Sequence, residues 1–97
     1  MSSRKTALLT GAAARIGASV AQALHGRGCD VMLHYNGNGD GAREWAGRLN
    51  ARRENSAVIA QADLSTAAGV ETLAEAFRKA FGRLDVLVNN ASRFYPT

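Results

Sequence analysis

A glycine turn at residues 10–17, TGAAARIG, links an apolar run to an amphipathic segment. Gly11 permits a tight turn, the small residues after it let a phosphate approach the backbone, and Gly17 lets the next helix pack closely on a sheet. A helix N-terminus supplies free N–H groups and a positive dipole end, to which Arg15 adds a forked cation. The turn therefore predicts a nucleotide pyrophosphate site, the alternative being an ordinary strand-to-helix turn.

A second polar stretch, residues 34–38, HYNGN, follows another apolar run. Many NAD-binding proteins carry Asp or Glu at this place to bind the ribose hydroxyls. No acid occurs here before Asp40, so nothing repels a 2′-phosphate, and Arg15, His34 and Asn38 could contact it. This favours NADP(H), although a histidine at a strand end can equally well hydrogen-bond to backbone.

Four apolar runs alternate with three segments of helical periodicity. The runs, which predict strands, cover residues 7–10, 31–35, 57–60 and 84–88. The helical segments cover residues 15–27 and 40–51, and a third that opens at Ser65 or Thr66 and ends at Gly82. Asp40 is the expected N-cap of the second segment. The expected apolar stripe of the third is Val70, Leu73, Phe77 and Phe81.

This β-α-β-α-β-α-β pattern predicts an α/β fold with a doubly wound parallel sheet of strand order 3-2-1-4. The first two helices would cover one face and the third helix the other. Ligands of such sheets bind at the carboxyl ends of the strands where the order reverses, here between the first and fourth strands.

Composition excludes several classes of protein. The chain has 97 residues, enough for one domain, and no apolar run long enough to cross a membrane. Its net charge of +4 comes from scattered basic residues with acids among them, which indicates solvated helix faces and no nucleic-acid partner. Cys29 is the single cysteine, so a reducing cytoplasm is expected, and with His25 and His34 it makes no metal-ligand set.

Three motifs together resemble the short-chain dehydrogenase/reductase family. They are the glycine turn, residues 62–65 (ADLS) and residues 87–92 (LVNNAS). Arg15, the pair His34 and Tyr35, and residues 49–53 (LNARR) and 89–97 (NNASRFYPT) are similar to the pteridine reductase branch. The resemblance implies the N-terminal half of a Rossmann-type fold and an enzyme that reduces oxidised pterins, and often dihydrofolate, with NADPH.

The resemblance also implies residue roles. Asp63 would hold the adenine amine with Leu64 beside it, Ser92 would contact cofactor phosphate and substrate, and Phe94 would stack on the pterin. The alternative for Asp63 is a cap of the third helix, and the alternative for Phe94 is packing. The expected cofactor-binding residues are Gly11, Arg15, Ile16, Gly17, His34, Tyr35, Asn36, Asn38, Asp63, Leu64, Asn90, Ala91 and Ser92. The expected substrate-binding residues are Arg15, Ser92 and Phe94.

The family's proton donor, a tyrosine four residues before a lysine, and its upstream serine have no counterpart in the 97 residues. Tyr35 has Gly39 at the fourth position, and Tyr95 has no fourth residue. The chain is therefore expected to be the NADP-binding half, residues 1–97, of a cytoplasmic enzyme that is homo-oligomeric at full length. The alternatives are another short-chain reductase acting on a carbonyl, or a nucleotide-binding truncation product without turnover. In the chain as given, the fourth strand would be an open edge that exposes Val86 or Leu87.

Overall fold

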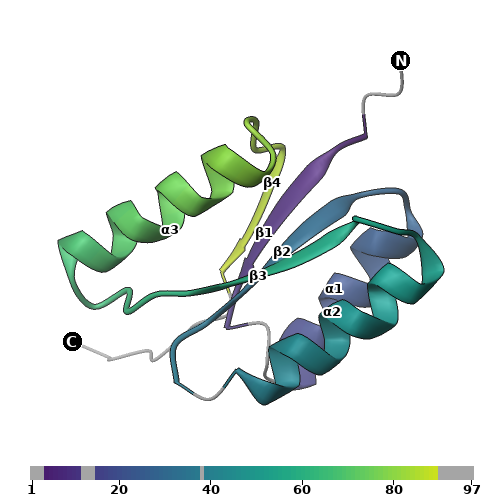
Figure 1. Ribbon diagram of the computed structural model, residues 1–97, viewed down its shortest axis with the longest axis horizontal. Coiled ribbons are helices and arrows are strands. Elements are labelled where there is room, and N and C mark those ends of the chain that lie inside the picture. Colours follow the sequence, from purple (N-terminus) through teal and green to yellow (C-terminus); the bar gives the residue numbers. More distant parts are fainter. Residues whose placement is uncertain (1–3, 12–14, 38, 90–97) are drawn as a thin grey trace.

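Four parallel strands form one sheet flanked by three helices in the computed structural model, which describes residues 4–11, 15–37 and 39–89 (Figure 1). The elements in chain order are β1 (Thr6–Thr10), α1 (Arg15–Gly26), β2 (Asp30–Tyr35), α2 (Asp40–Arg52), β3 (Ala57–Gln61), α3 (Ala67–Ala80) and β4 (Val86–Asn89). The strand order is β3-β2-β1-β4, which confirms the predicted doubly wound arrangement. All three pairings are parallel.

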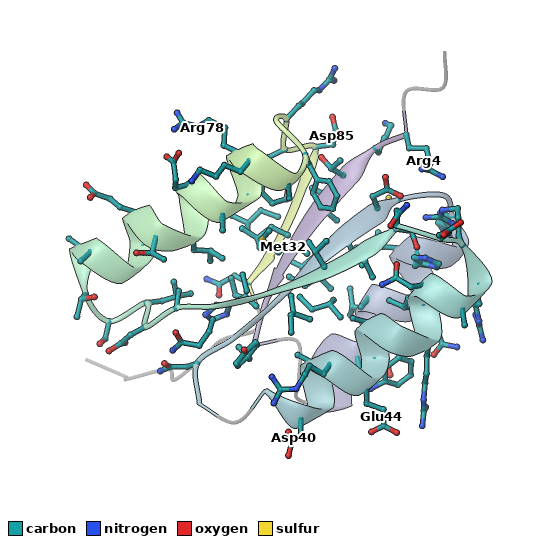
Figure 2. All side chains as sticks on the ribbon, viewed as in Figure 1. Arg4, Met32, Asp40, Glu44, Arg78 and Asp85 are labelled. Carbon is teal, nitrogen blue, oxygen red and sulfur yellow. The ribbon has the colours of Figure 1, made fainter. Side chains whose placement is uncertain are left out.

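The sheet separates two apolar clusters. Leu9 and Leu33, side by side in the register of β1 and β2, are fully buried beneath α1 and α2. Leu8 and Met32 point to the opposite face and pack with Phe77 of α3. Figure 2 labels Met32, which lies between the sheet and α3. As predicted, α1 and α2 lie on one face and α3 on the other (Figure 1). Every residue of β1 is buried, as expected for a strand with helices on both sides.

Thr66 caps the N-terminus of α3, which settles the choice between Ser65 and Thr66. Its hydroxyl oxygen accepts a hydrogen bond from the Gly69 N–H at 2.9 Å. Leu73 and Phe77, on the predicted apolar stripe, are buried, but Val70 of the same stripe is 49% exposed. Val70 lies near the start of α3, where the helix extends beyond the part of the sheet that it covers (Figure 1).

The predicted N-cap of α2 is wrong by one residue. Gly39 occupies the N-cap position and makes no side-chain cap, whereas Asp40 is the first residue of the helix. A Cβ atom at Gly39 would lie 2.5 Å from the ring of Tyr35, so a larger residue would require that ring to move. Asp40 still suits its place, because a carboxylate in the first turn of a helix interacts favourably with the helix dipole.

The fourth strand begins at Val86, two residues later than predicted. Leu84 is 46% exposed, and the Asp85 carboxylate accepts the Thr6 N–H at 2.9 Å, so Asp85 ties the start of β1 to the approach of β4. Leu87 is 59% exposed and Val86 half-buried, which confirms the expected exposure on this strand. Within the described residues, β4 and β3 are the two edges of the sheet.

Candidate functional site

Four chain segments meet at the carboxyl edge of the sheet. Gly11 follows β1, Tyr35 ends β2, Asp63 follows β3 and Asn89 ends β4. Because the strands are parallel, these ends lie at the same edge, and β1 and β4 are adjacent there. The sequence therefore predicts correctly that these separate motifs come together.

Gly11 adopts a left-handed backbone with φ of 63°, which favours glycine. The chain turns here from β1 toward α1, whose first residue is Arg15. Residues 12–14 and the side chains of Arg15 and Ile16 lie outside the described structure. Gly17, in the first turn of α1, is buried. A left-handed glycine between a buried central strand and a helix N-terminus is the geometry that accepts a phosphate.

The end of β1 is fixed to its neighbours on both sides. The Thr10 hydroxyl donates to Oδ1 of Asn89 at 2.8 Å on the β4 side. The Gly11 N–H donates to Nδ1 of His34 at 3.1 Å on the β2 side. Asn89 therefore links β4 to β1, and the glycine turn begins from residues that are hydrogen-bonded to both neighbouring strands.

His34 does not fit the predicted contact with a 2′-phosphate. Its side chain is buried, with the residue 2% exposed, and its Nε2 lies 2.8 Å from the carbonyl oxygen of Ala62. Both ring nitrogens therefore have backbone partners, at Gly11 and Ala62. The alternative, a histidine bound to backbone at a strand end, is what the structure shows.

The end of β2 and the start of the loop after it carry no acid, over the described residues 34–37. The Tyr35 ring is half-buried and packs against Gly39. Asn36 is exposed, and its carbonyl oxygen accepts a hydrogen bond from Nε2 of Gln61 at 2.8 Å. The last residue of the predicted set in this loop, Asn38, lies outside the described residues.

A cation that the sequence motifs do not predict lies beside this loop. Arg43, in the first turn of α2, donates to Oδ1 of Asp40 at 2.9 Å and also interacts with Tyr35. The hydrogen bond to Asp40 is the main cause that raises the pKa of Arg43. The spacing of three from Asp40 predicts the ion pair along the helix, but it does not predict the contact of Arg43 with Tyr35.

Asp63 is an exposed carboxylate held in a defined turn. Its Oδ1 accepts hydrogen bonds from the Ser65 hydroxyl at 2.6 Å and the Ser65 N–H at 3.0 Å, and these two bonds lower the pKa of Asp63. Thr66, not Asp63, caps α3. Leu64 is half-buried against the cluster beneath α3. The carboxylate is therefore ionised near neutral pH and accessible, as a contact to an amine requires.

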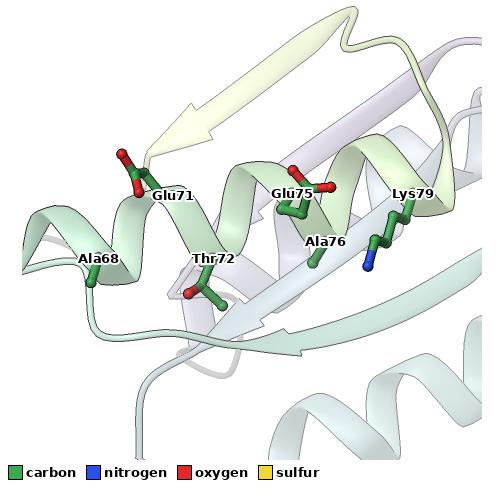
Figure 3. Close-up of a pocket in the computed structure, with 6 residues that line it drawn as sticks. All are labelled: Ala68, Glu71, Thr72, Glu75, Ala76 and Lys79. Carbon is green, nitrogen blue, oxygen red and sulfur yellow. The ribbon is translucent and has the colours of Figure 1, made fainter.

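The remaining predicted residues belong to the segment after β4. Asn90, Ala91, Ser92 and Phe94 lie outside the described residues, which end at Asn89, the last residue of β4. An open hollow elsewhere, along α3, contains none of the predicted site residues (Figure 3). It is lined by Ala68, Glu71, Thr72, Glu75, Ala76 and Lys79.

The described part of the chain holds neither a membrane span nor a metal cluster. No helix in it combines the length and apolar character that crossing a membrane requires. No three His, Cys, Asp or Glu side chains there are grouped so that they could hold a metal ion.

A parallel sheet of order 3-2-1-4 with a glycine turn after its inner strand β1 defines the N-terminal half of a Rossmann-type α/β fold. The short chain dehydrogenase family matches residues 5–96, and the chain belongs to that family.

Three relatives illustrate the similarity. Pteridine reductase 1 of Leishmania tarentolae is 49% identical over 94% of this chain and 37% of its own length. D-threitol dehydrogenase of Mycolicibacterium smegmatis is 39% identical over 90% of this chain and 33% of its own length. Hydroxynaphthalene reductase arp2 of Aspergillus fumigatus is 37% identical over 92% of this chain and 32% of its own length. The chain thus spans about a third of the length of these relatives.

Proposed function

We propose that this chain is the NADP-binding half, residues 1–97, of an NADPH-dependent reductase of oxidised pterins. The observation that carries the proposal is the 49% identity to a pteridine reductase over 94% of the chain. The cytoplasmic location and the homo-oligomeric state expected from the sequence are part of the same proposal.

The described residues fit a dinucleotide. The left-handed Gly11 and the start of α1 suit the pyrophosphate, with Arg15 adding a cation in the same turn. Asp63 offers an ionised and exposed carboxylate for the adenine amine. The predicted roles of Ile16, Gly17, Leu64, Asn90 and Ala91 around the cofactor belong to this proposal as well.

The preference for NADP(H) is supported by charge at the end of β2. Residues 34–37 contain no carboxylate that would compete with a 2′-phosphate. Arg43 lies against Tyr35 and is exposed, so its guanidinium is accessible to a phosphate beside that ring. Direct contact by His34 is not part of the proposal, since its nitrogens are bound to backbone.

When bound, the cofactor supplies a hydride to a C=N bond of the substrate. This chain's own residues bind and orient it: the glycine turn holds the phosphates, and Asp63 selects the base. Ser92 and Phe94 follow β4 in the sequence, and they are proposed to contact the substrate with Arg15. Phe94 suits a flat heterocycle because an aromatic face can stack on one. The proton donor is proposed to lie outside these residues.

A carbonyl substrate is the second candidate, supported by the identity to D-threitol dehydrogenase and to hydroxynaphthalene reductase arp2. A nucleotide-binding chain without turnover is the third candidate.

The experiment has two parts. NADPH and NADH are titrated into the purified chain, with cofactor fluorescence as the signal. NADPH oxidation is then measured with an oxidised pterin and with a keto ester, for the chain and for any longer reading frame that contains it. We expect NADPH to bind more tightly than NADH, and the longer protein to prefer the pterin. Faster turnover of the keto ester would assign the chain to the second candidate, and binding without turnover in either form would assign it to the third.

A further inference from the structure

His34 joins three strand ends through one imidazole ring. It lies on β2, Gly11 follows β1 on one side, and Ala62 follows β3 on the other. Its Nδ1 lies 3.1 Å from the Gly11 nitrogen, and its Nε2 lies 2.8 Å from the Ala62 carbonyl oxygen. The partners are 23 residues before His34 and 28 residues after it. The ring therefore connects the glycine turn to the loop that carries Asp63.

The two backbone partners fix the protonation of the ring. A backbone N–H can only donate, so Nδ1 must carry the lone pair that accepts from Gly11. A carbonyl oxygen can only accept, so Nε2 must carry the proton that goes to Ala62. His34 is consequently neutral, in the Nε2–H tautomer. No charge and no free ring nitrogen remains for a ligand.

The hydrogen bond to His34 holds the peptide group between Thr10 and Gly11, which leads from β1 into the glycine turn. The Thr10 hydroxyl binds Asn89 on the other side, so this peptide is held from both neighbouring strands. Gly11 has φ of 63° and no side chain, and its backbone would otherwise be the most adaptable of the turn. A binding loop that is ordered before its ligand arrives costs less entropy on binding.

We propose that His34 is a positioning residue of the dinucleotide site, which presets the glycine turn and couples it to the Asp63 loop without touching the cofactor. The proposal rests on the proposed binding of a dinucleotide at this turn. It differs from a phosphate contact in one measurable way: loss of His34 weakens NADPH and NADH equally, because the 2′-phosphate is not involved.

Two variants separate the two bonds. In His34→Asn the amide oxygen falls near the position of Nδ1 and can still accept from Gly11. In His34→Gln the amide nitrogen falls near the position of Nε2 and can still donate to Ala62, but Gly11 loses its acceptor. We expect His34→Gln to raise the dissociation constants of both NADPH and NADH by about tenfold, and His34→Asn to stay within about threefold of wild type.

His25→Asn is the matched control. His25 is also buried and hydrogen-bonded, with Nε2 2.6 Å from the Ser56 hydroxyl oxygen, but it lies at the opposite edge of the sheet. It should lower stability and leave both dissociation constants unchanged. If His34→Gln lowers the affinity for NADPH but not for NADH, the proposal is overturned in favour of a phosphate contact. If His34→Gln changes neither affinity, the proposal is overturned outright.

NMR tests the structural step without any ligand. Long-range ¹H–¹⁵N spectra of His34 should show a protonated Nε2 and an unprotonated Nδ1, and the Gly11 amide should exchange slowly in wild type and His34→Asn but rapidly in His34→Gln. An Nδ1–H tautomer, or equal Gly11 exchange in all three proteins, would overturn the proposal. If the wild-type protein binds neither dinucleotide but gives the expected NMR result, the proposed function is overturned. In that case His34 still orders the glycine turn, but it has no role in cofactor binding.

Discussion

Leu87 lies beside Leu8 in the register of β4 and β1, yet Leu8 is 7% exposed and Leu87 is 59% exposed. Both side chains point to the face that α3 covers, and α3 reaches over β1 and not over β4. An apolar residue therefore stands open on an edge strand whose outer hydrogen-bonding groups have no strand partner among the described residues. Open apolar edges of this kind tend to pair with other chains.

The first prediction concerns this edge. The purified chain should self-associate, and Leu87→Lys should shift it toward monomer by placing a charge on the open strand. Because Leu87 is exposed, the free energy of unfolding should change by less than about 0.5 kcal/mol. Leu8→Ala is the contrasting variant and should cost roughly 2–4 kcal/mol. Sedimentation velocity measures self-association, and urea melts measure the free energy of unfolding. A monomeric wild-type chain would contradict the prediction.

The second prediction concerns cofactor choice. Arg43→Ala should reduce the preference for NADPH over NADH by roughly 1 kcal/mol, or about fivefold, because the 2′-phosphate loses a cation. Arg48→Ala is the control, since Arg48 lies on the same helix, is similarly exposed and pairs with Glu44 at 2.8 Å. It should leave the preference unchanged. If both variants reduce the preference for NADPH over NADH equally, the preference depends on the overall positive charge and not on a contact of Arg43 with the 2′-phosphate.

A third prediction concerns the pterin. Phe94→Ala should weaken pterin binding roughly tenfold by removing a stacking face, while the affinity for NADPH stays nearly unchanged. Phe81→Ala is the control: Phe81 packs edge-on against Phe77 with ring centroids 5.3 Å apart, so its loss should lower stability without affecting the pterin. Loss of cofactor binding in Phe94→Ala, with the pterin unaffected, would assign Phe94 to the fold.

Two glycines in helices should respond oppositely to alanine. A Cβ at Gly69 would collide with the carbonyl oxygen of Asp63, so Gly69→Ala should destabilise the protein by roughly 1–3 kcal/mol and disturb the Asp63 loop. A Cβ at Gly47 in α2 would meet nothing within 4 Å, so Gly47→Ala should stabilise by about 0.5–1 kcal/mol. Thermal melts of both variants measure the difference, and effects of the same sign would contradict it.

The fifth prediction concerns pH. Burial lowers the pKa of His25, and Arg53 and Arg52 lower it further, against the opposing effect of Asp30. Below the unfolded value of about 6.5, the unfolded chain binds a proton that the folded chain does not. Stability from His25 is therefore complete above pH 6.5 and is lost as pH falls toward the lower folded pKa, at up to about 1.4 kcal/mol per pH unit.

Urea midpoints between pH 5 and pH 7.5 measure this dependence for wild type and His25→Asn. The variant should show a flatter profile across that interval. Carboxylates such as Asp85, whose pKa is lowered mainly by the Thr6 N–H, contribute their own loss of stability only at lower pH. An identical slope in both proteins would exclude His25 as the cause.

The fold is predictable because its signals are local and repeated. Apolar runs, helical spacing and Gly11 together predict the strands, their order and the edge at which the motifs meet. The features that the sequence does not predict depend on partners distant in sequence. The backbone partners of His34 could not be identified from the sequence, because nothing in residues 34–38 indicates that its nitrogens meet Gly11 and Ala62. Val70 fits the spacing of the apolar stripe of α3, but it is exposed because the start of the helix extends beyond the sheet.

The site is predictable at the level of motifs and less so at the level of atoms. Gly11 and Asp63 lie where their spacing places them. Arg43 escapes prediction because its relevance comes from contact with Tyr35 across the start of α2. The N-cap at Gly39 escapes it for a similar reason, since the space beside it is filled by the ring of Tyr35.

The bond between Thr6 and Asp85 also has a consequence for the order of assembly. The two residues are 79 positions apart, so the edge of β1 that receives β4 stays open until the residues of β4 have been synthesised. Closing a segment of this length costs more chain entropy than the β1–β2 and β2–β3 pairings, whose partners are much nearer in sequence. During synthesis, β1 is therefore an edge strand until β4 is made. In that interval the open edge of β1 can pair with a strand other than β4, and the nascent chain must avoid such pairing.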